Sequence, residues 1–243
     1  FYIMKILCVI PARGGSKRLP KKNLEYINGQ SLIERASIVV RNIDHVVDTI
    51  VTSDSKEIIN HSKDLGLLAP FVRPKNLSSD EASSVDVVIH ALNWYESNIN
   101  EVDAILLLQP TSPFRKKSSI LKAIDLLINK NCKSVISVNL THSHPKWTFK
   151  YSNEYLETYL EDHGLNTRSQ DLDPAYVVNG NIYLTYKKAL IQNKSFFTDQ
   201  TIPYILNNDI ECLDIDTHHD LELARYYSNN KLWKQDNDKN TRS

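Results

Sequence analysis

The residues best suited to chemistry lie in the loop Pro11–Asn23, which follows an apolar run at Ile6–Ile10. Gly14 and Gly15 allow the backbone to turn sharply and to present N–H groups to an anion. Five cations share the same short stretch: Arg13, Lys17, Arg18, Lys21 and Lys22. A triphosphate needs both convergent donors and positive charge. The loop therefore predicts a phosphate site more strongly than the alternative, a solvated basic turn, because ligands of open α/β sheets bind beyond the carboxyl ends of strands.

A second chemical signal is the carboxylate pair Asp214 and Asp216. Residues two apart in a strand point to the same face, and neighbouring carboxylates repel unless a cation lies between them. Mg²⁺ takes such oxygen ligands and completes its shell with phosphate and water. The alternative is a strand followed by a helix capped by Asp216 or Thr217, and the spacing alone leaves both interpretations open. Asp220 and Glu222 are expected to be solvated helix residues.

Alternating strands and helices must position these groups. Apolar runs predict strands at Ile6–Ile10, Thr49–Thr52, Ala104–Leu108, Ser134–Val138, Ile182–Tyr186 and Cys212–Ile215. Helical patterns are found at Leu32–Ile43, Ser55–Leu65, Ser84–Tyr95, Ser118–Ile128 and Asp220–Tyr227. This alternation is typical of βαβ units. It predicts a three-layer α/β/α nucleotide-binding fold with a mostly parallel sheet.

The pattern changes between about residues 141 and 205. Trp147, Phe149 and Tyr151 alternate with polar residues, which predicts a projecting hairpin. We expect this insertion to form a small lobe that makes a dimer contact, within a single domain spanning residues 4–228. Residues 1–3, ahead of the only methionine, are expected to be a remnant, and residues 229–243 a polar tail frayed over its last ten positions.

Composition argues against several functional classes. The chain has 243 residues, 29 basic and 29 acidic, so no net charge favours nucleic acid or an acidic membrane surface as a partner. Three scattered cysteines are too few for a disulfide framework, as expected in a reducing cytoplasm. The apolar start FYIMKILCVI is too short to span a bilayer. We therefore expect a cytoplasmic protein with no nucleic-acid or membrane partner.

The loop, together with further segments, resembles the acylneuraminate cytidylyltransferases, the CMP-sialic acid synthetases, including members similar to CMP-legionaminic acid synthetases. The further segments follow in the family's order: RPKNLSSDEASS (Arg73–Ser84), LLQPTSPFR (Leu107–Arg115), NGNIY (Asn179–Tyr183), NKSFF (Asn193–Phe197) and LDIDTHHDL (Leu213–Leu221). Together they span residues 4 to about 228. The loop is neither GxGxxG nor GxxxxGK[ST], which excludes the dinucleotide and P-loop motifs.

The resemblance implies a Rossmann-like nucleotide-diphospho-sugar transferase fold and a homodimer. The substrates would be CTP and a nine-carbon keto-sugar acid such as N-acetylneuraminic acid, and the metal Mg²⁺ or Mn²⁺. In the implied reaction the anomeric hydroxyl attacks the α-phosphorus of CTP in line and releases pyrophosphate. The residues that would carry the chemistry are Arg13, Lys22, Asp214 and Asp216, with the two aspartates holding the metal.

The resemblance also implies binding roles. The CTP phosphates and ribose would be bound by Arg13, Gly14, Gly15, Ser16, Lys17, Lys22 and Asn23. Arg73 and Ser84 would flank the cytosine, although Arg73 alone suggests a surface arginine before a proline. The sugar acid would be contacted by Gln109, Arg168, Tyr183, Phe196 and Phe197. Without the family, Gln109 lies in a strand-to-helix turn with Ser112 as a cap, and the aromatic residues suggest core or dimer packing.

One position departs from the family, which places a substrate-site lysine shortly after a His-Pro dipeptide. Here His144–Pro145 is followed at once by Lys146, so the lysine comes one position early. In a segment of period two this shift turns the side chain to the opposite face. Either a local bulge restores Lys146 or Trp147 occupies its place, and we expect altered sugar specificity.

Three alternatives remain. A cytidylyltransferase for an eight-carbon acid such as Kdo would have a differently composed first loop. A non-catalytic nucleotide sensor would be expected to lack the carboxylate pair. A glycosyltransferase would carry its Asp-x-Asp motif after a middle strand, whereas here the middle strand ends in QPTSP.

Overall fold

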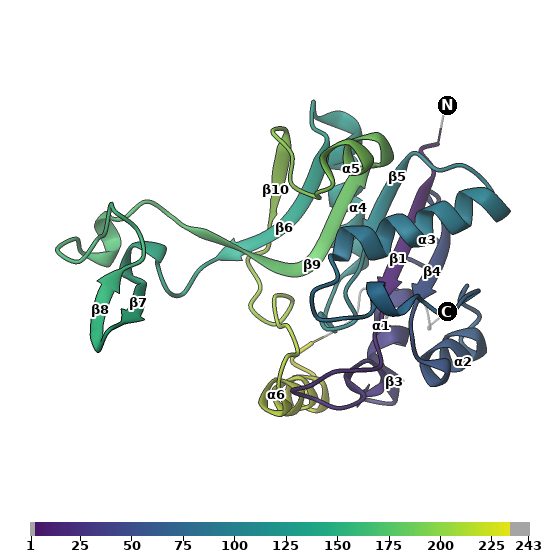
Figure 1. Cartoon of the computed structure of the whole chain (residues 1–243), viewed down its shortest axis with the longest axis horizontal. Helices are drawn as coiled ribbons and strands as arrows, with labels where there is room; N and C mark the ends of the chain where they lie inside the picture. The colour runs from purple at the N-terminus through teal and green to yellow at the C-terminus, as the bar shows by residue number, and fades with distance from the viewer. Residues whose placement is uncertain (1–2, 234–243) are drawn as a thin grey trace.

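A six-stranded sheet organises residues 3–233, the part of the chain that the computed structural model describes (Figure 1). Its order is β10 (Thr201–Ile205), β6 (Ser134–Leu140), β9 (Tyr176–Tyr186), β5 (Ala104–Leu107), β1 (Ile6–Pro11) and β4 (Val46–Thr52). Only β9 runs antiparallel to its neighbours, β5 and β6. The remaining pairs are parallel. The predicted mostly parallel α/β sheet is confirmed.

Helices cover both faces of the sheet, and alternate side chains of β1 pack against the helices on opposite faces. Ile6, Cys8 and Ile10 belong to one core cluster, which also contains residues of α1 (Leu32–Ile38), α2 (Lys56–Asp64) and α4 (Lys117–Asn129). Leu7 and Val9 belong to a second cluster, with residues of α3 (Ser84–Asn98) and α5 (Lys187–Asn193). Side chains of a strand alternate between faces, so a strand buried on both faces must be apolar throughout.

A third, smaller core lies beyond the carboxyl ends of the strands. Leu19 from the loop after β1 packs there with Phe114 from the segment after β5. Ile215 and Leu221 join them from the segment that leads into α6 (His218–Asn229) and from α6 itself. The short strands β2 (Tyr26–Ile27) and β3 (Gln30–Ser31) cover the same region. This core holds together three segments that carry the predicted chemistry.

Two predicted elements differ from the structure. The first helix ends at Ile38 rather than Ile43, because the chain turns and Asn42 takes a left-handed φ of 57°. Cys212–Ile215 forms no strand; one backbone bond, from Ile215 N to Thr111 O at 2.8 Å, anchors it beside the segment after β5. The other predicted strands and helices are present, with ends that differ by up to six residues.

The predicted hairpin is present and projects away from the sheet (Figure 1). It consists of β7 (Phe149–Ser152) and β8 (Tyr155–Thr158). The projecting part is shorter than the predicted lobe of about 141–205, because residues 176–205 return to the main sheet as β9, α5 and β10. The lobe therefore corresponds to about residues 141–175.

At the C-terminal end, residues 229–232 of the predicted polar tail are exposed, whereas Trp233 packs against the third core. The Trp233 ring packs against Phe114, with ring centroids 5.3 Å apart. The expected frayed end, Lys234–Ser243, and residues 1–2 lie outside the described residues. Within residues 3–233, no helix combines the length and apolar character needed to cross a membrane.

Candidate active site

A cavity of about 330 Å³ lies at the carboxyl ends of β1 and β5. Nine residues singled out from the sequence line it: Arg13, Ser16, Lys22, Asn23, Arg73, Ser84, Gln109, Asp214 and Asp216. They come from four separate segments of the chain. A concave site that gathers charged groups from distant segments is the default position for ligand binding.

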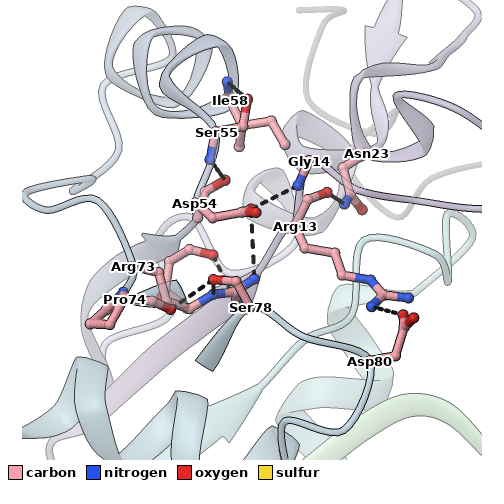
Figure 2. A network of polar contacts seen from close by, with 12 residues as sticks. Arg13, Gly14, Asn23, Asp54, Ser55, Ile58, Arg73, Pro74, Ser78 and Asp80 are labelled. Carbon is pink, nitrogen blue, oxygen red and sulfur yellow. Dashed lines mark hydrogen bonds and ion pairs between the residues drawn. The ribbon is translucent and has the colours of Figure 1, made fainter. Parts of the chain in front are cut away.

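The loop after β1 forms one wall through its side chains. Asn23, which is buried, donates from Nδ2 to the Arg13 carbonyl at 2.9 Å and so closes the loop on itself (Figure 2). The Gly14 N–H donates to Asp54 Oδ1 at 2.9 Å. A Cβ at Gly14 would lie 2.9 Å from the Ser55 Cβ, so glycine permits this close approach to the start of α2. The amide of Gly14 is thus engaged within the protein, whereas Gly15 has open space around it.

A carboxylate that the sequence analysis did not single out, Asp80, forms ion pairs with two cations of this loop. Its two oxygens lie 2.5 Å from Arg13 Nη1 and 2.5 Å from Lys17 Nζ (Figure 2 draws the Arg13 contact). Hydrogen bonds from Lys17 and Arg13 lower the pKa of Asp80 below its usual range. Asp80 lies within the family-like segment RPKNLSSDEASS, but nothing in its spacing indicated that it would meet the loop. Two of the predicted phosphate-binding cations are therefore already paired.

Arg73 is 4% exposed, so the interpretation as a surface arginine is wrong. Its Nε donates to Ser78 Oγ at 3.2 Å and its Nη1 to the Thr52 carbonyl at 3.4 Å. Burial lowers the pKa of Arg73, an effect that the Asp54 carboxylate, 4.0 Å from Nη2, opposes. Ser84 is the first residue of α3, whose N-terminus is capped by the side chain of Ser83. Both Arg73 and Ser84 face the cavity.

The aspartate pair lines the cavity beside the loop after β1. Asp216 Oδ1 lies 3.0 Å from Lys22 Nζ, and its Oδ2 lies 3.6 Å from Arg18 Nη1. Asp214 is less accessible, and its Oδ1 is buried without a hydrogen-bond partner. Burial raises the pKa of Asp214, a hydrogen bond from Thr111 lowers it, and the Asp216 carboxylate raises it again. Hard cations such as Mg²⁺ prefer oxygen ligands, and a carboxylate oxygen without a hydrogen-bond partner beside a second carboxylate has this chemistry.

The sequence left open whether Asp216 or Thr217 caps the following helix, and in the structure the cap is Thr217. Its side chain caps α6 and forms a capping box with Asp220. Asp220 Oδ2 accepts from the backbone N–H groups of both Asp216 and Thr217. Asp220 is therefore a cap partner rather than a solvated helix residue, while Glu222 remains half-exposed and pairs with Arg225. Because Thr217 takes the cap, both aspartate side chains remain at the cavity.

Gln109 faces the cavity from the segment after β5, directly above a glycine. A Cβ built on Gly180 would lie 2.6 Å from Gln109 Oε1. Gly180 also has a φ of +73°, which favours glycine. Ser112 does not cap α4, whose N-cap is Lys116; the Ser112 hydroxyl is buried without a partner.

The other predicted sugar contacts lie outside the cavity. Phe196 is 5% exposed and belongs to the second core cluster, with its ring 5.5 Å from that of half-buried Tyr183. Arg168 and Phe197 are exposed, and Arg168 lies on the lobe. Lys146 is paired with Asp162 at 2.7 Å, and Trp147 Nε1 donates to the Gly164 carbonyl at 2.9 Å. Within this chain, neither Lys146 nor Trp147 lines the cavity.

The fold is that of the nucleotidyltransferases. Solved structures share the architecture at low identity: CMP:2-keto-3-deoxy-manno-octonic acid synthetase complexed with CTP has a TM-score of 0.68 at 18% identity, covering 93% of this chain and 99% of that one. A 4-diphosphocytidyl-2C-methyl-D-erythritol synthase has a TM-score of 0.65 at 12% identity, covering 92% and 97%.

A family model for cytidylyltransferases matches residues 7–238, and the chain belongs to that family. It is 35% identical over 232 residues to the CMP-N,N'-diacetyllegionaminic acid synthase of Legionella pneumophila, covering 91% of this chain and 95% of the relative. It is also 35% identical to a pseudaminic acid cytidylyltransferase of Campylobacter jejuni, over 91% of this chain and 95% of the relative. An N-acylneuraminate cytidylyltransferase of Streptococcus agalactiae is 32% identical over 89% of this chain and 52% of its own length.

Proposed function

We propose that this enzyme transfers CMP from CTP to the anomeric hydroxyl of a nine-carbon keto-sugar acid and releases pyrophosphate. The observation that carries the proposal is the 3.0 Å contact between Lys22 Nζ and Asp216 Oδ1, which brings a cationic loop and an acidic pair into one cavity. Relatives named for legionaminic, pseudaminic and N-acylneuraminic acids support the nine-carbon substrate.

The phosphate end of CTP would bind at the loop after β1. Arg13, Ser16 and Lys22 all line the cavity there. Positive side chains aimed at the leaving pyrophosphate stabilise the charge that develops in the transition state. Arg73 and Ser84, on the other side of the loop, would receive the cytosine. The buried guanidinium of Arg73 is held by Ser78 and Thr52, so it would present a fixed edge to the base.

The residues present fit a divalent cation. Asp214 and Asp216 would hold Mg²⁺ or Mn²⁺, because Asp214 Oδ1 is buried and unpartnered and because both side chains face the cavity. No group of three or more His, Cys, Asp or Glu residues within residues 3–233 forms a closed metal site. That composition suits Mg²⁺, which is typically bound through one or two carboxylates together with substrate phosphates. When bound, the metal would supply charge neutralisation at the α-phosphate and acidify the attacking hydroxyl.

The sugar acid would lie near Gln109, next to the carboxylate pair. An exposed arginine such as Arg168 is suited to bind a carboxylate in bidentate fashion. Arg168 and Phe197 do not line this cavity, so they would act on the site of a second protomer. The core position of Phe196 favours packing beneath Tyr183 over direct contact with the sugar.

A homodimer formed through the lobe would bring Arg168 and Phe197 of one protomer to the cavity of the other. The lobe exposes a concentration of large apolar side chains: Tyr151 (77% exposed), Tyr155 (75%), Leu156 (69%) and Tyr159 (61%). Exposed apolar patches of this kind mark interaction surfaces. Leu156→Glu should give a monomer in light scattering, while Leu121→Glu, at an exposed leucine of α4, should leave the dimer intact. A monomeric wild-type protein at micromolar concentration would exclude this arrangement.

We also propose a cytoplasmic location, where CTP is available. Cys8 and Cys132 are buried, and all three cysteines are free, as suits a reducing compartment.

The test is pyrophosphate release with CTP and a panel of sugar acids: N-acetylneuraminic, legionaminic, pseudaminic and the eight-carbon Kdo. We expect turnover with at least one nine-carbon acid and little with Kdo. Asp216→Asn should abolish turnover at saturating CTP, whereas Glu222→Gln, a carboxylate of α6 that pairs with Arg225, should not. Preference for Kdo would select the eight-carbon alternative. Binding of CTP without turnover of any acid would select the nucleotide sensor.

A further inference from the structure

A buried arginine, Arg115, lies behind the active-site cavity without lining it. The side chain is 1% exposed, and it is the largest of the fully buried side chains within residues 3–233. It is absent from the residues that line the cavity. Burial lowers the pKa of Arg115 to about 10, an effect opposed by Cys8, Glu211 and Asp214. The side chain therefore stays charged at neutral pH. Burying a charge costs free energy unless the charged group is hydrogen-bonded. The hydrogen-bond partners of Arg115 therefore show which parts of the fold its side chain stabilises.

Two of its nitrogen atoms donate to backbone carbonyls on two different strand ends. Nε donates to the Asn181 carbonyl at 2.6 Å, and Nη2 donates to the Gln109 carbonyl at 3.0 Å. The antiparallel ladder between β5 and β9 ends at the pair Leu107 and Tyr183. Two residues further along each strand, that register places Gln109 opposite Asn181. Arg115 thus bridges the two segments just beyond the point where backbone pairing between β5 and β9 stops.

β9 is irregular at this point and depends on side chains for its shape. The register between β6 and β9 shifts between Ile136 and Val138, and Gly180 has a left-handed φ. Ser137 Oγ bonds Asn179 Oδ1 at 2.6 Å and accepts from Ile182 N at 2.7 Å. Arg115 secures the other side of the same irregular stretch. A planar guanidinium with donors in a fixed fork suits this bridging better than a lysine ammonium does.

The same stretch continues to the segment that carries the aspartates. Asn181 Nδ2 donates to the Glu211 carbonyl at 2.7 Å. The Glu211 side chain is also buried, and its Oε1 accepts from Ser119 Oγ at 2.5 Å. Arg115, Asn181 and Glu211 therefore link the segment after β5, the irregular part of β9 and the chain leading to Asp214.

We propose that Arg115 is a positioning residue that bridges the Gln109 and Asn181 carbonyls and thereby holds the Gln109 side chain over Gly180, facing the sugar-acid site. This proposal rests on the proposed function for its choice of substrate. Arg115 does not line the cavity, and of its two hydrogen-bond partners only Gln109 does, while its effect on the nearby Asp214 carboxylate is electrostatic. Its loss should therefore weaken sugar binding more than CTP binding.

The test compares Arg115→Lys, which keeps the charge but loses the fork, with Gln109→Ala and with the double variant. We expect Arg115→Lys to raise the KM for the sugar acid about tenfold and to change the KM for CTP less than twofold. The effects of the two substitutions should be non-additive, as for residues acting through one another. Arg35→Lys is the matched control, because Arg35 is also buried and donates twice, to the Ile27 carbonyl, away from the cavity.

Hydrogen exchange supplies a readout independent of the substrate. In Arg115→Lys, amides of residues 108–112 and 178–183 should exchange at least about tenfold faster, while those of β4 should not change. Unchanged exchange in both segments, or a lowered Tm with unchanged KM for the sugar acid, would overturn the proposal. If Gln109→Ala leaves the sugar KM unchanged, the assigned sugar site is wrong, and the exchange experiment alone decides the role of Arg115.

Discussion

Lys22 Nζ lies 3.0 Å from Asp216 Oδ1, although 194 residues separate them along the chain. The lysine side chain is 15% exposed and that of the aspartate 54%. The contact joins the loop after β1 to the segment before α6, and both segments are anchored in the third core through Leu19 and Ile215. The ammonium thus occupies one oxygen of the proposed metal pair in the free enzyme.

From this contact we predict that Lys22 and the metal compete for Asp216. Lys22→Met should bind Mn²⁺ about fivefold more tightly in the absence of CTP, as expected from the loss of a partly exposed ion pair. The measurement is Mn²⁺ titration followed by electron paramagnetic resonance. Lys21→Met is the matched control, because Lys21 pairs with Glu57 instead. Equal Mn²⁺ affinity in wild type and Lys22→Met would contradict this competition.

Asp80 should oppose nucleotide binding, because it pairs with Arg13 and Lys17, two cations that we assign to the phosphates. Asp80→Asn should lower the Kd for CTP about two- to fivefold at low salt, with a smaller effect at high salt because exposed charges are screened. Titration calorimetry at two salt concentrations measures both effects.

The control for Asp80 is Glu81→Gln, which removes the same charge from the neighbouring exposed position. An equal gain in that variant would indicate a general charge effect rather than release of Arg13 and Lys17. Weaker CTP binding in Asp80→Asn would mean that Asp80 orders the loop for binding.

Gly180→Ala should impair catalysis beyond its effect on stability. The substitution strains a residue with φ +73° by about 1–2 kcal/mol, and its Cβ would also meet Gln109 Oε1 at 2.6 Å. Gly66→Ala separates the two effects, because Gly66 has φ +76° but nothing within 4 Å. We expect similar losses of unfolding free energy and a selective rise in the sugar-acid KM for Gly180→Ala. Equal kinetics in the two variants would show that Gln109 is not held by Gly180.

Two thiols should make the enzyme less stable in alkaline solution. Burial raises the pKa of Cys8 to about 12, and burial together with Glu211 and Asp209 raises the pKa of Cys212 to about 11. In the unfolded chain a thiol ionises near 8.5. Above that pH the unfolded state loses protons that the native state retains, so the free energy of unfolding falls as pH rises.

The accompanying measurement is the reaction of native protein with a thiol-specific disulfide reagent at pH 8. Cys8 should remain unmodified on a timescale in which denatured protein reacts at all three cysteines. Rapid labelling of Cys8 in the native protein would contradict the burial that raises its pKa.

Local patterns in the sequence determined most of the elements. Continuous apolar runs such as Ile6–Ile10 predict buried strands, and the helical patterns that begin at Ser55 and Ser84 place the starts of α2 and α3 to within one residue. The clustering of glycine and cations at Pro11–Asn23 marked a candidate anion site, because composition within one loop is visible without a fold. Ordered motifs along the chain indicated the family.

Tertiary structure alone decided how those pieces meet. The burial of Arg73 and Arg115, the pairing of Asp80 with Arg13, and the packing of Trp233 on Phe114 depend on contacts between residues far apart in the chain. Asp214 and Asp216 face one cavity without forming a strand, because Thr217 and Asp220 take the helix cap and Ile215 is bonded to Thr111. Sequence periodicity reports which face of an element is apolar, and it carries no information on which distant side chain will cover that face.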